Sequence, residues 1–309
     1  MRALSWMGAV LLFLTACSGN GRDPKPGSIH LDQPTPSDET QPVVHFGVIS
    51  RYNPVVMYEE YQPIMDYLTS ETPYRFELKL GKTYEDAVSF LGQGVTQIAS
   101  LGSVTYLEAH AQFGAVPILR PLNKKGEPFY RSIIVVRKDS DVETLTDLKG
   151  RSFGFASVHS TSGNLFGRYA LEQVGVHLQG LGQYTNFKHH DQVAKAVLAG
   201  QYDAGSVKDI VAYRYEPKGL RFLHISDPIP SVPLVVRTDA PPAFVRAVKD
   251  VLLRLDRENP DHQRIMVDWN EEFKYGFVEA TDGDYETVRA MLNAIPRRCG
   301  GACHPALHF

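Results

Sequence analysis

The sequence alternates between short apolar runs and stretches whose apolar residues recur at helical spacing, and this alternation limits the possible folds most strongly. The apolar runs 43–49 and 76–80 are followed by helical spacing over 55–68 and 84–91, and a third run covers 97–101. Strands that alternate with helices indicate a mostly parallel sheet with helices on its faces. We therefore expect an α/β protein.

The same alternation continues in the second half of the chain. Long apolar strands are expected at 131–137 and 233–237, and between them a strand at 183–187, a helix at 191–198 and a strand within 204–209. No tandem repeat is visible, so the two halves share only this pattern.

Four residues of the first half follow strands directly. Ligands of such sheets bind beyond the carboxyl ends of the strands. This rule places Ser50, Tyr52, Ser103 and Tyr106 at the mouth of a site. Tyr106 also fits an apolar helical face, so a core position is an equal alternative for it.

A cluster of hydroxyl residues lies between the strand expected at 151–156 and the next helix. It contains Ser157, Ser160, Thr161 and Ser162. Free N–H groups and the dipole at a helix start attract an oxyanion. A simple N-cap would need only one such residue. The spacing alone leaves both interpretations open.

The N-terminus has the composition of an export signal. Residues 1–17 contain a positive start, an apolar core too short to span a bilayer, and small residues before Cys17. This ending resembles a bacterial lipobox, in which Cys17 is lipidated; a plain secretory signal is the alternative. Residues 18–42 are rich in Pro, Gly, Asp, Ser and Thr, which is typical of a disordered tether. The folded part is therefore expected from residue 43.

Several stretches together resemble one family of proteins. The apolar strand 130–136 and the segment 145–155 occur in the order of the hinge crossing and second-lobe entry of periplasmic solute-binding proteins. The segment 157–163, the pair His190–Asp191 before a helix, and the segment 203–207 are similar to the phosphate/phosphite/phosphonate-binding subfamily of ABC-transporter solute-binding proteins. The similarity covers about residues 43–292.

The resemblance implies a type II periplasmic binding fold, with two α/β lobes, two crossing strands at the hinge and the ligand between the lobes. The crossings would be 132–137 and 234–237. The expected domains are lobe one at 43–131 plus 238–295, lobe two at 138–233, and a cysteine-containing tail at 296–309.

The resemblance also implies ligand-binding residues. Ser160, Thr161, Ser162 and Gly163 would hold the oxyanion, and His190 would donate an N–H, with a stronger charge-assisted bond if it is protonated. A surface position at a helix start is the alternative for His190. From the first lobe, the expected residues are Tyr52 and Ser103, with Ser50 and Tyr106 behind them.

The expected ligand is a small phosphorus oxyanion: phosphite, phosphate or an alkylphosphonate. Binders of aminoethylphosphonate in this family carry an acid before the second crossing, about where this chain has Val232. An aminoalkyl ligand would leave an unpaired buried cation, which is costly. Asp209 is expected to supply an acceptor for the proton of hydrogenphosphate, so phosphate stays among the candidates.

The tail contains a second cysteine pattern. Cys299 and Cys303 in an exported protein are expected to form a disulfide or stay free thiols. The order Cys299, Cys303, His304 is also a longer variant of the C-x-x-C-H motif that attaches haem c.

These observations predict a binding protein and no enzyme, because no P-loop and no nucleophile with a paired base is visible. We expect an exported, membrane-anchored lipoprotein, in the periplasm or at the cell surface, that is a monomer and serves an ABC permease. No cofactor or metal is expected apart from the haem alternative. The net charge of −3 gives no sign of nucleic-acid binding. The alternatives are a ligand-sensing module of the same fold with a membrane partner, and a c-type haem protein.

Overall fold

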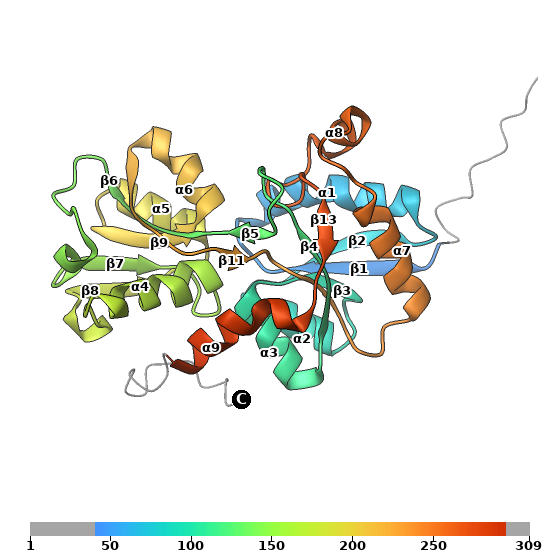
Figure 1. The fold of residues 1–309 in the computed structure, drawn as a ribbon, viewed down its shortest axis with the longest axis horizontal. Coiled ribbons are helices and arrows are strands. Elements are labelled where there is room, and N and C mark those ends of the chain that lie inside the picture. Colours follow the sequence, from blue (N-terminus) through green and yellow to red (C-terminus); the bar gives the residue numbers. More distant parts are fainter. Residues whose placement is uncertain (1–40, 295–309) are drawn as a thin grey trace, which may run out of the picture. The chain divides into compact units, whose positions relative to one another are not determined.

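The computed structural model describes residues 41–294, which fold around two β-sheets joined by a short two-stranded ribbon (Figure 1). The strand orders are β13-β4-β12-β3-β1-β2 in the first sheet, β10-β6-β9-β7-β8 in the second and β11-β5 in the ribbon. We call the part built on the six-stranded sheet lobe one and the part built on the five-stranded sheet lobe two.

The strands of lobe one are β1 (Val43–Val48), β2 (Arg75–Leu80), β3 (Ile98–Ser100), β4 (Val116–Pro121), β12 (Leu234–Val236) and β13 (Phe277–Glu279). Those of lobe two are β6 (Ser132–Arg137), β7 (Ser152–Phe155), β8 (Gln183–Asn186), β9 (Ala204–Lys208) and β10 (Leu220–Ile225). The ribbon consists of β5 (Phe129–Tyr130) and β11 (Ile229–Pro230).

The helices of lobe one are α1 (Pro54–Glu71), α2 (Tyr84–Gly92), α3 (Ser103–Phe113), α7 (Pro242–Leu253), α8 (Pro260–Met266) and α9 (Glu286–Ala294). Those of lobe two are α4 (Gly167–Gln173), α5 (His190–Leu198) and α6 (Asp209–Tyr215). A π-helical segment, Thr161–Phe166, leads directly into α4. The expected α/β class with two lobes is confirmed.

The direction of the paired strands shows how the chain builds each sheet. In lobe one, β1 runs parallel to β2 and β3, whereas β12 lies antiparallel between β3 and β4. In lobe two, β7 runs parallel to β8 and β9, and β6 is antiparallel to β9. Each sheet therefore contains a parallel βαβ core, and the chain adds β12 to lobe one when it returns from lobe two.

The predicted position of the crossings was wrong by a few residues. The stretch 132–137 is β6, inside the sheet of lobe two, and the stretch 234–237 begins with β12, inside the sheet of lobe one. The segments between the lobes are β5 and β11, which pair in antiparallel register. Long apolar runs are buried inside sheets, so the hinge falls on the shorter segments before them.

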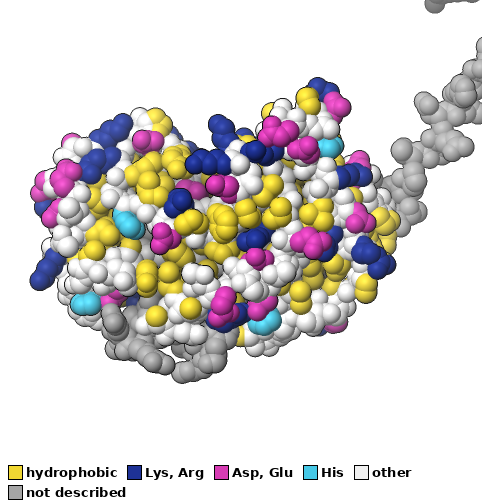
Figure 2. Space-filling view, viewed as in Figure 1, with side chains coloured by type: hydrophobic (Ala, Val, Ile, Leu, Met, Phe, Trp, Pro, Cys, Tyr) yellow, Lys and Arg dark blue, Asp and Glu magenta, His cyan; other side chains and the backbone are white. Residues whose placement is uncertain are grey.

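In Figure 2, basic and acidic side chains are interspersed over the face in view. Within residues 41–294, none of the helices combines the length and the apolar character that crossing a bilayer requires.

Candidate anion-binding site

A small cavity lies between the lobes and takes its walls from both of them. Its volume is about 10 Å³, which is room for about one water molecule and far below the roughly 300–1,000 Å³ typical of pockets for drug-sized ligands. Its lining residues are Ile49, Arg51, Tyr84, Gly102, Tyr130, Ser160, Thr161, Ser162, His190, Lys208 and Val232. None of these described lining residues is a carboxylate.

The hydroxyl cluster forms the part of the wall that belongs to lobe two. Ser160 is the N-cap of the π-helical segment, and its Oγ accepts the N–H of Gly163 at 3.1 Å. Thr161 Oγ1 accepts the N–H of Val104 from α3 at 3.0 Å, which links the two lobes. Three helical segments begin next to this cavity, at Ser160, Ser103 and His190, and each start is a lining residue or the neighbour of one. Three positive dipole ends therefore meet here.

His190 is buried behind the hydroxyls and is held in one tautomer. Its Nδ1 accepts the N–H of Lys208 at 3.1 Å, so in the neutral ring Nε2 carries the proton. Nε2 lies 3.2 Å from Ser160 Oγ. Burial, together with Lys208 and Arg51, lowers the pKa of His190 to about 3. The charge-assisted bond considered for a protonated His190 is therefore not available at neutral pH.

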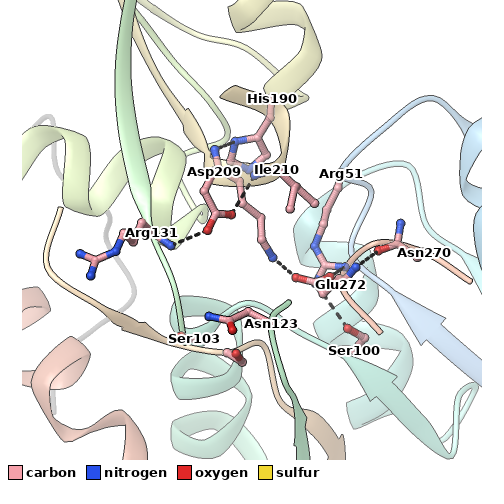
Figure 3. A network of polar contacts seen from close by, with 12 residues as sticks. Arg51, Ser100, Ser103, Asn123, Arg131, His190, Asp209, Ile210, Asn270 and Glu272 are labelled. Atoms are coloured by element: carbon pink, nitrogen blue, oxygen red, sulfur yellow. Dashed lines mark hydrogen bonds and ion pairs between the residues drawn. The ribbon is translucent and has the colours of Figure 1, made fainter. Parts of the chain in front are cut away.

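The positive charge at the cavity comes first from Arg51, in the loop after β1. Its guanidinium is 3% exposed, donates to Tyr61 Oη at 2.6 Å and to Ser100 Oγ at 3.3 Å, and lies 2.7 Å from a carboxylate oxygen of Glu272 (Figure 3). These partners fix the side chain in place. A buried arginine with this many partners keeps its charge.

Lys208, at the end of β9, brings a second cation from the other lobe. Its ammonium contacts Glu272 and lies 4.3 Å from the centre of the Tyr130 ring. Burial, and then the charge of Arg51, lower the pKa of Lys208 well below its usual value. An anion in the cavity would favour the charged form and oppose that shift. Glu272 thus joins one cation from each lobe.

The remaining walls are aromatic and apolar. Burial raises the pKa of Tyr84 to about 12 and raises that of Tyr130 further, so both phenols keep their protons and are donors. Ile49 and Val232 are both 2% exposed and add apolar surface. The cavity therefore offers many donors, two cations and one apolar edge.

The structure brings four of the predicted site residues together at this cavity: Ser160, Thr161, Ser162 and His190. Gly163 lies directly behind them. A Cβ on Gly163 would come within 2.4 Å of Ala156 Cβ and 2.7 Å of His190 Cε1, so only glycine lets the ring pack against the loop. Its backbone N–H and C=O are used inside the loop.

The other predicted residues lie away from this cavity. Ser50 Oγ donates to the carbonyl of Gly81 at 2.6 Å and lines a neighbouring cleft. Tyr52 is buried under the guanidinium of Arg214, 5.2 Å from its ring centre. Ser103 is buried, with Oγ 3.5 Å from the carbonyl of Pro230.

Tyr106 and Asp209 are also engaged elsewhere. Tyr106 is in the core, where its Oη donates to Asp282 at 2.5 Å. Asp209 lines a separate cavity, and its carboxylate accepts the N–H groups of Arg131 at 3.0 Å and Ile210 at 2.8 Å (Figure 3). It therefore does not reach this cavity as the acceptor that we expected.

Sequence reasoning missed Arg51, Tyr84, Tyr130 and Lys208 as lining residues. Arg51 and Lys208 each follow a buried strand directly, and a cation at that position of an α/β sheet is the signal that could have identified them. Glu272, which holds both, has no local signal at all.

A second histidine of lobe two stands at the rim of the contact between the lobes. His159 Nδ1 is 2.8 Å from Glu108 of α3 and its Nε2 is 2.5 Å from Glu85 of α2. Burial opposes protonation, but the hydrogen bonds and charges of Glu108 and Glu85 raise the pKa of His159 above its usual value. Unlike His190, this histidine is therefore favoured in its charged form.

Some predictions fall outside the described residues. They concern the signal and Cys17, the tether 18–40, and the tail with Cys299, Cys303 and His304. Within residues 41–294, no three His, Cys, Asp or Glu side chains are grouped so that they could hold a metal ion.

Comparison with known proteins places this architecture in a class. The crystal structure of PhnD1 from Prochlorococcus marinus (MIT 9301) in complex with methylphosphonate superposes with a TM-score of 0.73 at 22% identity, over 81% of this chain and 97% of that one. The fold is that of a two-lobe periplasmic binding protein.

The family follows from the sequence profile described as ABC transporter, phosphonate, periplasmic substrate-binding protein, which matches residues 46–285. This chain belongs to that family, whose members bind and hand over substrates and are not enzymes. It is 27% identical to the probable ABC transporter phosphite binding protein PhnD1 of P. marinus and 23% identical to the phosphonates-binding periplasmic protein of Escherichia coli K12. These alignments cover 54% and 57% of this chain, and 62% and 53% of the relatives.

Proposed function

We propose that this chain captures a small phosphorus oxyanion, namely phosphite, phosphate or an alkylphosphonate, and delivers it to an ABC permease. The observation that carries the proposal is the cavity between the lobes, where hydroxyls, a fixed histidine and two buried cations converge. Because both lobes contribute donors, a bound anion would favour the state in which the lobes are together. The kinship with phosphite- and phosphonate-binding proteins supports the same ligand class.

The walls argue against a ligand that carries its own ammonium group. Arg51 and Lys208 would repel it, and no carboxylate among the described lining residues would pair with it. Val232 lies in the wall, where it suits an apolar edge such as a P–H bond or a methyl group. A buried unpaired cation would cost several kcal/mol.

Calorimetric titration tests the proposal. The purified protein is unfolded and refolded to remove bound anion, and is then titrated with phosphite, phosphate, methylphosphonate and aminoethylphosphonate. Binding of at least one of the first three, and no heat with the aminoalkyl compound, is expected. No binding of any of the four would contradict the proposed function.

Transport and sensing are separated by a deletion in the native host. Loss of uptake of the bound anion is expected, because delivery to a permease needs the binding protein. Unchanged uptake with a lost response to the anion would instead favour the sensing module that the sequence left as an alternative.

Members of this periplasmic family are exported from the cytoplasm. We propose that residues 1–17 are removed before a lipidated Cys17 and that residues 18–42 tether the folded, monomeric part to the membrane. Fractionation of cells that express the protein or its Cys17→Ser variant tests the anchor. The variant is expected to leave the membrane fraction, and an unchanged distribution would contradict the lipid anchor.

A further inference from the structure

The side chains around the cavity are arranged as donors of hydrogen bonds. Arg51 has only donors, as does Lys208 in the charged form that a bound anion favours, and the Nδ1 acceptor of His190 is used by the N–H of Lys208. Ser160 Oγ accepts the N–H of Gly163 at 3.1 Å and lies 3.2 Å from the protonated Nε2. Both of its acceptor positions are thus occupied, and the Tyr84 hydroxyl is a further hydrogen-bond partner of Ser160.

The other hydroxyls complete this pattern. Thr161 Oγ1 already accepts the N–H of Val104 at 3.0 Å. Tyr84 and Tyr130 are buried and protonated, and they are hydrogen-bonded to the cavity hydroxyls, Tyr84 to Ser160 and Tyr130 to Thr161 and Ser162. A ligand oxygen that meets these groups is expected to accept, and a ligand that carries a P–OH proton would have to turn one of these hydroxyls around against the two cations.

The charged groups around the cavity also favour a ligand that only accepts hydrogen bonds. Arg51 and Lys208 line the cavity, whereas Glu272 lies behind them, in the wall of the neighbouring cavity that also contains Asp209. Both Asp209 oxygens accept backbone N–H groups. His189, next to His190, is directed to the carbonyl of Ser50 at 2.8 Å. The cations are therefore the charges nearest to a ligand.

We infer that the cavity takes its anion as a dianion with no proton on any oxygen. At a double negative charge, phosphite and alkylphosphonates have three bare oxygens, whereas hydrogenphosphate keeps one P–OH. The inference deepens the proposed function and rests on it. It ranks phosphite and methylphosphonate above phosphate, and it predicts that sulfate, a dianion without a proton, binds better than hydrogenphosphate does.

The decisive experiment compares methylphosphonate with methanesulfonate, which has the same tetrahedral shape but always carries one charge. Both affinities are measured by calorimetry on the whole protein at several pH values. Titration of protein groups acts on both ligands, so the ratio of the two affinities removes the part of the pH dependence that the ligands share. The ratio is also measured in Lys208→Met, which separates the titration of Lys208 from the ionisation of methylphosphonate.

The expected ratio falls about tenfold for each pH unit below the second pKa of methylphosphonate. A ratio that stays constant with pH would overturn the inference and leave the proposed function intact. Absence of methylphosphonate binding at every pH would instead overturn the proposed function.

Two further measurements sharpen the test. At a pH where phosphate is a dianion, sulfate is expected to bind more tightly; tighter binding of phosphate would show that the cavity has a proton acceptor and would overturn the ranking. In Lys208→Met, the preference for methylphosphonate over methanesulfonate is expected to drop at least tenfold. An unchanged preference in a folded variant would contradict the role of the second cation.

Discussion

The two sides of the cavity are built in different ways. One continuous loop of lobe two contributes the neutral donors Ser160, Thr161 and Ser162, while the cation of this lobe, Lys208, comes separately from the end of β9. Lobe one contributes the charge of Arg51, which depends on Glu272 from a distant part of the chain. The neutral donors are thus determined by local sequence, whereas the charged wall depends on long-range packing.

The largest effect is expected from breaking the charged side. Arg51→Met would leave Glu272 with one cation fewer and should lower the free energy of unfolding by about 3–5 kcal/mol. Anion affinity should fall more than about thirtyfold. Denaturant unfolding and calorimetry measure the two quantities.

The matched variant for this test is Glu272→Gln, which removes the carboxylate and keeps both cations. It should also lose stability but should retain tight anion binding, because the positive wall is intact. Wild-type affinity in Arg51→Met would show that the charge of lobe one does not attract the ligand.

A second test addresses the neutral side through pH. The pKa of His190 is about 3 in the folded protein and near 6.5 in the unfolded chain, so the unfolded state takes up the proton first as the pH falls. The stability contributed by the neutral ring is complete above about pH 6.5 and declines by about 1.4 kcal/mol for each pH unit down to about pH 3.

The control for this pH effect is His190→Asn, in which an amide oxygen can still accept the N–H of Lys208. The difference in unfolding free energy between wild type and variant should change with that slope between pH 6.5 and pH 4. A difference that is independent of pH would mean that the folded His190 is protonated after all.

A smaller effect is expected from the loop itself. Gly163→Ala would push a methyl group to within 2.4 Å of Ala156 Cβ and 2.7 Å of His190 Cε1, and should destabilise the protein by about 1–3 kcal/mol. Gly180→Ala is the matched control, because a Cβ there meets no atom within 4 Å. Equal melting temperatures for the two variants would contradict the close packing of loop and ring.

The same contrast explains what the sequence could predict. Strand and helix periodicity gave the α/β class, and the run of hydroxyls before a helix identified Ser160, Thr161 and Ser162, which do line the cavity. Local patterns contain this information because an N-cap and a helix start involve only neighbouring residues.

The other residues of the cavity are positioned by long-range packing, which local sequence patterns do not contain. The turn after β1 was recognised, but Ser50 and Tyr52 were chosen and Arg51 was passed over, since only the packed structure shows which of three adjacent side chains points inward. Asp209 was expected at the ligand because the proton of hydrogenphosphate needs an acceptor. The backbone N–H groups of Arg131 and Ile210 occupy it instead.

The smallest expected effect concerns the hydrogen bond between the Val104 N–H of lobe one and the Thr161 hydroxyl. Thr161→Val removes the acceptor of the Val104 N–H and should cost about 1 kcal/mol, whereas Thr161→Ser keeps the hydroxyl and should cost less. Hydrogen exchange of the Val104 amide in the ligand-free protein measures this directly. Faster exchange in the valine variant, with near wild-type protection in the serine variant, is the expected result. Equal protection in both variants would mean that the Thr161 hydroxyl does not hold the Val104 amide and that other contacts, such as those of His159 with Glu85 and Glu108, join this loop to lobe one.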